Sequence, residues 1–126
     1  EAGIKDVGVI GVDSGYELYI GGNGGIKTEV AQFFCKVTND DEVMEYGGAF
    51  IQLYREEGFY LERTCHYLER VGMEHIKKEV LEDADKRKAL YDKLLFALQN
   101  YKDPWTEIVE DRSGGEFKRQ FEIIKV

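Results

Sequence analysis

The chain has 126 residues, about the length of one domain, and 43% of them are hydrophobic, which is ordinary globular composition. Its 25 acidic and 17 basic residues give a net charge of −8, which argues against a nucleic-acid or membrane-surface partner because phosphate would be repelled. No run approaches the roughly 18 apolar residues of a membrane span, and Cys35 and Cys65 lack the spacing of a zinc ribbon, so we expect two thiols in a reducing cytosol.

Residues 7–37 predict a small antiparallel β portion. Residues 7–12 are apolar and residues 16–20 alternate, and the intervening Asp13-Ser14-Gly15 is typical of a three-residue hairpin loop. A third strand is predicted over Val30 to Val37, with a helix as the competing interpretation. A run as apolar as residues 7–12 usually lies in the middle of a sheet, so we expect polypeptide outside these residues to complete the sheet.

A helical period begins at Asn39, which together with Asp40 is a candidate N-cap. Gly47-Gly48 inside the first helix costs about 1 kcal/mol per glycine, which predicts the close approach of another backbone. Four helices are expected, from Asn39 to Gly58, Phe59 to Val71, Met73 to Leu81 and Asp85 to Tyr101. Their predicted buried faces are, in order, Val43, Tyr46, Gly47, Phe50, Leu53 and Tyr54; Leu61, Cys65 and Leu68; Ile76 and Val80; and Leu90, Leu94, Ala97, Leu98 and Tyr101. The fold class is therefore α+β, with a final strand or extended tail after residue 113.

The glycine-rich stretch Gly21–Gly25 is the most distinctive feature of the sequence. A phosphate-binding P-loop is disfavoured because Ile26 separates the glycines from Lys27-Thr28, and the dinucleotide fingerprint lacks its third glycine. Two interpretations stay open. One is a turn between strands, which Asn23-Gly24 favours, and the other is bare backbone packed against a large flat cofactor.

The titratable residues form no catalytic pattern. His75 and Glu79 are four residues apart on a predicted helix, but two ligands without a third make a weak metal site. Cys65 and His66 point about 100° apart on a helix and are a poor nucleophile–base pair. We therefore predict no catalytic and no metal-binding residues, and a free-standing protein-interaction domain remains one functional alternative.

Long ordered strings run through most of residues 1–112. They are IKDVGVIGVDSGYELYIGGNGG over residues 4–25, FCKV over 34–37, YGGAFIQLYREE over 46–57, YLERT over 60–64, ERVG over 69–72 and DPW over 103–105. These strings closely resemble the large subunit of NAD(P)H-dependent assimilatory nitrite reductase. The resemblance implies that the chain is a C-terminal fragment of such a subunit.

The resemblance implies a division of the chain and a set of cofactors. Residues 1–37 would end the sirohaem/4Fe-4S domain, residues 38–112 would be a helical C-terminal extension, and residues 113–126 a tail or final strand. Sirohaem, a 4Fe-4S cluster, FAD and NAD(P)H belong to the full-length protein, and we expect none of them in this fragment, because in the family the four cluster cysteines lie upstream. Gly22, Asn23, Gly24 and Gly25 are the residues we expect near sirohaem.

The implied reaction is the reduction of nitrite to ammonia in the cytoplasm, and the fragment itself is expected to be inactive. The upstream domains of the same subunit, a small nitrite reductase subunit and further copies of the subunit are the implied partners. A sulfite reductase of the same fold is the nearest alternative.

Overall fold

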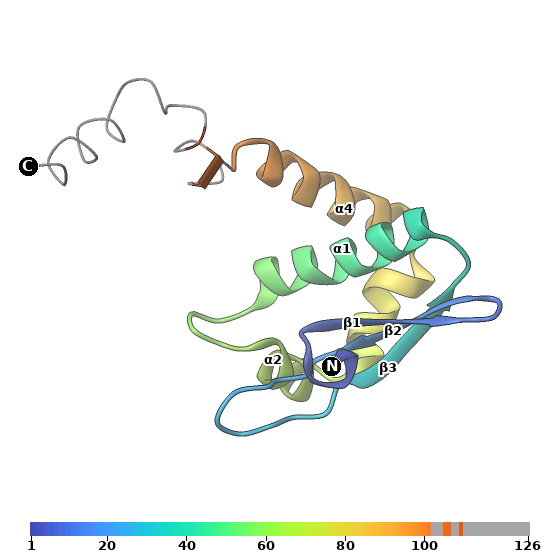
Figure 1. The fold of residues 1–126 in the computed structure, drawn as a ribbon. Coiled ribbons are helices and arrows are strands. Elements are labelled where there is room, and N and C mark those ends of the chain that lie inside the picture. Colours follow the sequence, from blue (N-terminus) through green and yellow to red (C-terminus); the bar gives the residue numbers. More distant parts are fainter. Residues whose placement is uncertain (102–104, 107–108, 110–126) are drawn as a thin grey trace, which may run out of the picture. The chain divides into compact units, whose positions relative to one another are not determined.

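The computed structural model describes residues 1–101, 105–106 and 109, and the chain divides into two compact units, Glu1–Phe96 and Ala97–Val126. The fold class is α+β, as predicted, and residues 1–101 form a three-stranded antiparallel sheet followed by four α-helices (Figure 1). The elements are η1 (Ala2–Ile4), β1 (Val7–Val12), β2 (Gly15–Ile20), β3 (Gln32–Val37), α1 (Asp40–Glu57), α2 (Thr64–Val71), α3 (Met73–Lys77), the π-helical segment η2 (Lys78–Glu82) and α4 (Ala84–Gln99). The strand predicted near the C-terminus lies outside the described residues.

The predicted hairpin is confirmed, but its loop is shorter than expected. Val12 pairs with Gly15, so two residues, Asp13 and Ser14, connect β1 to β2. Gly15 is the first residue of β2 and has a φ of +146°, and a Cβ atom there would lie 2.1 Å from the carbonyl oxygen of Val37. Glycine is therefore required at this position because β3 passes so close to it.

The strand order is β1-β2-β3, so the apolar run at residues 7–12 is an edge strand among the described residues, and β2 is central. Val9 and Ile10 of β1 are 42% and 41% exposed. An unprotected apolar edge is unusual in a finished sheet, because its free backbone groups can pair with another strand. Completion of the sheet by other polypeptide therefore stays a prediction.

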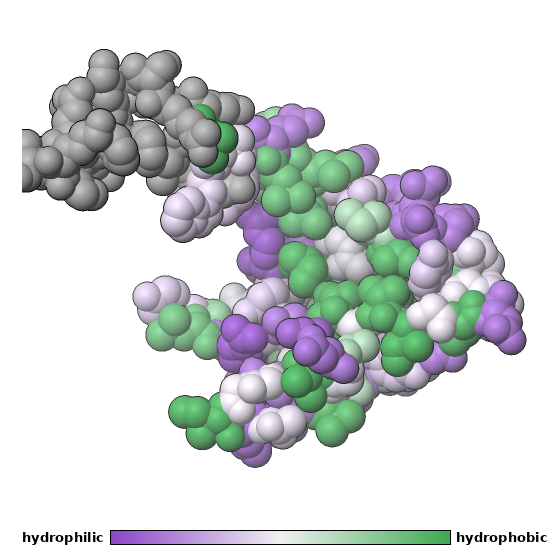
Figure 2. Space-filling view, viewed as in Figure 1, coloured by the Kyte–Doolittle hydropathy of each residue, from purple (hydrophilic) through white to green (hydrophobic). Residues whose placement is uncertain are grey.

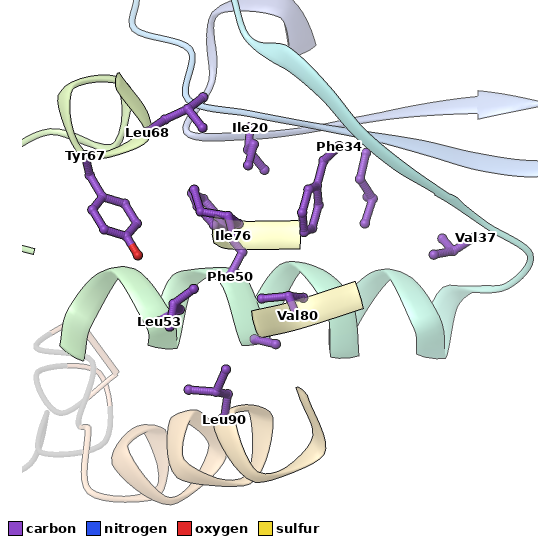
Figure 3. Close-up of a cluster of buried hydrophobic side chains, with 12 residues drawn as sticks. Ile20, Phe34, Val37, Phe50, Leu53, Tyr67, Leu68, Ile76, Val80 and Leu90 are labelled. Atoms are coloured by element: carbon purple, nitrogen blue, oxygen red, sulfur yellow. The ribbon is translucent and has the colours of Figure 1, made fainter. Parts of the chain in front are cut away.

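Helix α1 lies between the sheet and α4 and carries much of the buried surface (Figure 3). It begins where the sequence predicts, because the side-chain oxygen of Asn39 accepts a hydrogen bond of 2.9 Å from the backbone amide of Glu42. It ends at Gly58, also as predicted. One hydrophobic cluster joins the sheet to the helices and consists of Leu18, Ile20, Phe34, Val37, Ala49, Phe50, Leu53, Tyr67, Leu68, Ile76, Val80 and Leu90.

The two glycines inside α1 make room for side chains, not for the backbone that we expected. A Cβ atom on Gly47 would lie 3.6 Å from Val7 of β1, which is an ordinary contact. A Cβ atom on Gly48 would lie 2.7 Å from the ring of Tyr91 on α4. Gly48 is therefore the position where packing requires a glycine, because consecutive helical residues face different neighbours.

The second predicted helix starts five residues too early. Leu61 has a φ of +63°, which a right-handed helix does not allow, and its side chain is 82% exposed. A turn replaces the helix, with the amide of Glu62 donating to the carbonyl oxygen of Phe59. Helix α2 therefore begins at Thr64, and of the predicted stripe only Cys65 and Leu68 are buried.

The later helices agree with the sequence over most of their length. Ile76 and Val80 are buried as predicted, in a helical segment that passes from α3 into η2. Leu90 of α4 is buried as predicted. Leu98 and Tyr101 are 54% and 68% exposed, so the prediction that they face the core is wrong. Both residues belong to the second compact unit, outside the unit that holds the core.

Candidate functional site

The connection between β2 and β3 contains the glycine-rich stretch, and it packs against the N-terminal arm, residues 1–6. A Cβ atom on Gly22 would lie 2.7 Å from both the carbonyl carbon of Ile4 and the carbonyl oxygen of Lys5. Glycine is therefore needed at residue 22 to let the two backbones meet. Three backbone hydrogen bonds join the arm to the connection: Gly21 N to Asp6 O at 3.0 Å, Gly22 N to Lys5 O at 3.0 Å and Ala31 N to Gly3 O at 2.7 Å.

Asn23 holds the connection in shape from within. Its side-chain oxygen accepts from the amide of Gly25 at 3.4 Å, and its side-chain nitrogen donates to the carbonyl oxygen of Lys27 at 3.0 Å. Its backbone exchanges two hydrogen bonds of 2.9 Å with Glu29. The interpretation of this stretch as a turn between strands is therefore confirmed, with Asn23 as its organising residue.

An open depression of about 570 Å³ lies beside this turn. Gly24 and Gly25 are exposed in it, and the nearest atom to an added Cβ would be a side-chain atom in both cases, of Ile4 at 3.2 Å for Gly24 and of Asn23 at 3.5 Å for Gly25. Three of the four predicted site residues, Asn23, Gly24 and Gly25, line the depression, whereas Gly22 is buried against the backbone of the N-terminal arm. Its lining residues are Ile4, Lys5, Asp6, Asn23, Gly24, Gly25 and Arg63.

Two cations at this depression were missed by the sequence interpretation. Arg63 donates to both carboxylate oxygens of Asp6 at 3.3 Å, and Lys5 lies 3.9 Å from Glu1. Thr64 donates from its hydroxyl to the same Asp6 at 2.5 Å. Local sequence patterns carry no signal for this grouping, because Asp6 and Arg63 are 57 residues apart. Lys5 and Arg63 bring two positive charges to the depression against the one negative charge of Asp6, and this net positive charge favours an anionic ligand.

The residues considered for metal binding and catalysis are engaged elsewhere. His75 contacts both carboxylate oxygens of Glu57 at 2.8 Å, while Glu79 pairs with Lys86. Burial would raise the pKa of Glu57, but hydrogen bonds from Tyr67 and His75 outweigh it and lower that pKa. The contacts of Glu57 join α1 to α2 and α3, and the Glu79–Lys86 pair joins η2 to α4, so their role is structural.

Neither cysteine has the surroundings of a cluster ligand. Burial raises the pKa of the Cys35 thiol to about 11, and Cys65 is buried in α2. Among residues 1–101, 105–106 and 109, no three His, Cys, Asp or Glu side chains gather as metal ligands. This part of the chain therefore does not fit a 4Fe-4S cluster held by its own thiolates.

In the same part of the chain, no helix has the length and apolar character to cross a membrane.

Comparison with known proteins gives a consistent result. The chain is 48% identical over 112 residues to "Nitrite reductase [NAD(P)H]" of Bacillus subtilis, which is 89% of this chain and 14% of that protein. It is 35% identical over 114 residues to the "Assimilatory nitrate reductase electron transfer subunit" of the same organism, which is 90% of this chain and 15% of that protein. "Nitrite reductase [NAD(P)H]" of Emericella nidulans is 30% identical over 96% of this chain and 11% of its own length.

The chain thus spans about one-seventh of the length of the first two relatives. No solved structure matches it significantly. The family model described as "Nitrite and sulphite reductase 4Fe-4S domain" matches residues 1–88, which include the sheet, the glycine-rich connection and the helices as far as the start of α4. The chain belongs to the nitrite and sulphite reductase 4Fe-4S domain family.

Proposed function

We propose that this chain is part of the large subunit of a cytoplasmic NAD(P)H-dependent nitrite reductase, which reduces nitrite to ammonia. The observation that carries the proposal is the 48% identity over 112 residues to a nitrite reductase, together with the family match over residues 1–88. In such a subunit, FAD, NAD(P)H, a 4Fe-4S cluster and sirohaem would supply the redox chemistry when bound. Since the described thiols do not fit a cluster, the cluster ligands come from other parts of the subunit.

Nitrite is favoured over sulfite as the substrate. The relatives named as nitrite reductases include the one at 48% identity, whereas the "Sulfite reductase, assimilatory-type" of Nitratidesulfovibrio vulgaris is 28% identical over 81 residues. The full-length enzyme should therefore show a higher kcat/KM with nitrite than with sulfite under the same electron donor. A higher value with sulfite would overturn this assignment.

The depression beside the glycine turn is the proposed contribution of this chain to cofactor binding. Sirohaem is a flat macrocycle with several carboxylates, and it supplies the iron at which the anion is reduced. Gly24 and Gly25 present bare backbone at the depression, and neither has a side chain of its own that would keep a flat group away from the backbone. Lys5 and Arg63 supply positive charge to carboxylates, with Gly22 and Asn23 holding the turn in place.

Filling the depression tests this role directly. Gly24→Leu and Gly25→Leu, made in the full-length subunit, place a side chain in the depression at positions where the backbone accepts one. We expect the sirohaem content, measured by absorption per polypeptide, and nitrite turnover to fall several-fold. Gly11→Leu is the matched control, because a Cβ atom there meets nothing within 4 Å and Gly11 does not line the depression. Unchanged sirohaem content in both variants would overturn the role of the depression.

The length of the relatives supports further domains of the same subunit as partners of this chain. The upstream domains of the same subunit are the first proposed partner, and a small nitrite reductase subunit and further subunit copies are the others. Reading the coding sequence ahead of Glu1 separates this proposal from a free-standing interaction domain. We expect that sequence to encode four cysteines in two close pairs, and a start codon directly before the Glu1 codon would overturn the proposal.

A further inference from the structure

The loop that joins α1 to α2 displays three consecutive large apolar residues. Phe59, Tyr60 and Leu61 are 64%, 93% and 82% exposed. In Figure 2 the tip of this loop shows green, hydrophobic atoms beside pale purple ones, and green atoms also lie at the tip of the β2–β3 connection. Single exposed apolar residues are common, but three in a row on one loop mark an interaction surface.

The loop is held firmly by side chains outside it. Arg70 of α2 donates to both carboxylate oxygens of Glu62 at 2.8 Å and to the carbonyl oxygen of Glu57 at 3.0 Å, and its guanidinium lies 3.8 Å from the ring centre of Phe59. Glu62 in turn accepts from the amide of Phe59 at 3.1 Å. Tyr54 of α1 donates to the carbonyl oxygen of Glu62. The loop is therefore ordered by its own domain, while its apolar tip makes little contact with it.

The backbone at the tip of the loop is strained at Leu61, whose side chain is exposed to solvent. The φ of +63° at Leu61 is a left-handed conformation, which a leucine side chain rarely adopts. Glycine would relieve this strain. Within the described residues the leucine side chain is 82% exposed, so little burial of that side chain offsets the strain. A preformed apolar loop loses little freedom on binding, which is the property of an anchor residue at an interface.

The position of the loop indicates what it contacts. Arg63, two residues after Leu61, bonds to Asp6 of the N-terminal arm and lines the depression proposed to face sirohaem. The loop, the arm and the depression therefore lie at one continuous surface. The first two relatives are about seven times as long as this chain, so a subunit of that length has ample polypeptide to cover this surface.

We propose that the Phe59–Leu61 loop is a docking element that seats this part of the chain on the preceding domains of the same subunit, in an apolar pocket. This inference rests on the proposed function, in that the chain is part of a longer reductase subunit. Tyr60 and Leu61 enter the pocket, while Phe59 stays stacked on Arg70 and fixes the loop.

Photo-crosslinking in the full-length subunit tests the docking. Tyr60 is replaced by p-benzoylphenylalanine, and the same probe at Lys88, an exposed residue of α4, is the control. We expect light to link position 60 to peptides of the same polypeptide that precede Glu1, at a yield several-fold above that at position 88. Links to a second copy, recognised as mixed-isotope peptides, would overturn the proposal, and so would a yield no higher than that of the control.

A second variant separates docking from folding. Leu61→Gly removes the apolar side chain and relieves the positive φ, so the subunit should keep its fold by circular dichroism. Crosslinking from position 60 should fall several-fold in this variant, and an unchanged yield would contradict the role of Leu61. Neither crosslinking nor circular dichroism depends on bound sirohaem, so the two proposals can fail separately. If Gly24→Leu leaves the sirohaem content unchanged while position 60 crosslinks as expected, the role of the depression in sirohaem binding is refuted and the docking loop is retained.

Discussion

Two regions of the molecule differ in how fully their side chains are buried and paired. One is the helical side, formed by α1 to α4, and the other is the arm surface, formed by residues 1–6, the β2–β3 connection and the α1–α2 loop. On the helical side, buried polar groups find partners within the chain, and Arg87 reaches Glu45 and the carbonyl oxygens of Val80 and Leu81. Within the described residues, no buried side-chain polar atom lacks a hydrogen-bond partner. At the arm surface, by contrast, Ile26 and Tyr60 are almost fully exposed and glycine backbone lies bare.

This difference indicates that folding and recognition use separate residues. The core cluster around α1 is large enough to hold the first compact unit together, because it joins all three later helices to the sheet. The arm surface leaves apolar area unburied, which costs stability unless another surface covers it. Substitutions on the helical side should therefore change the stability of the chain, whereas those at the arm surface should change what it binds.

The largest expected effect is at Phe50, in the centre of the core. Its ring is fully buried and lies 6.2 Å from that of Phe34. Phe50→Ala should lower the free energy of unfolding by about 3–5 kcal/mol, because both burial and packing are lost. Denaturant unfolding measures this, with Met44→Ala on the exposed side of the same helix as the control, where we expect a change within about 0.5 kcal/mol. Equal effects at the two positions would contradict the placement of the core.

Removal of the Arg87 guanidinium should have the next largest effect. This side chain is buried, bonds to Glu45 and to two carbonyl oxygens, and stacks 4.2 Å from the ring centre of Tyr46. Arg87→Met leaves these acceptors without a donor, so the free energy of unfolding should fall by about 2–3 kcal/mol. Lys88→Met, one residue further along α4 and exposed, is the control. A loss below about 1 kcal/mol for Arg87→Met would show that water replaces the guanidinium as the hydrogen-bond donor, and therefore that water reaches this part of the helical side.

The glycine pair in α1 offers a contrast within one helix. Gly48→Ala places a methyl group against the ring of Tyr91 and should destabilise the chain by about 1–2 kcal/mol. Gly47→Ala meets only Val7 at 3.6 Å, so the higher helix propensity of alanine should stabilise the chain by up to about 1 kcal/mol. Thermal unfolding of both variants measures the two signs. Adding Tyr91→Leu should remove the penalty at residue 48, and its persistence would mean that the ring is not the cause.

Local chemistry made most of the fold predictable. The hairpin, the Asn39 cap and the end of α1 at Gly58 depend on residues next to one another in the sequence. The turn at residues 59–63 does not, because its shape depends on Tyr54 and on Arg70 from another helix. Helical spacing alone therefore extended α2 too far toward the N-terminus.

The candidate site was predictable in part for the same reason. The glycine stretch identified the turn, since both its flexibility and its Asn-Gly pair are local signals. Its close packing on the arm depends on Ile4 and Lys5, and the second cation comes from Arg63, far along the chain. Such a grouping appears only after the sheet and α2 have come together.

The smallest expected effect is a pH dependence at the boundary between the two regions. The hydrogen bonds from Arg70 hold the pKa of Glu62 at about 2, below its ordinary value of 4.5. A carboxylate with a lowered pKa stabilises the folded state fully above pH 4.5, and this contribution disappears as the pH falls toward 2. The stability difference between the unmodified chain and Glu62→Gln should therefore be largest near neutral pH and shrink between pH 4.5 and 2. Unfolding measured across this range tests it, with Glu69→Gln, an exposed position on α2, as the control. If the difference in unfolding free energy between the unmodified chain and Glu62→Gln stays constant with pH, Arg70 holds the loop without the charge of Glu62. The loop would then be stabilised by its contacts with α2 and not by this ion pair.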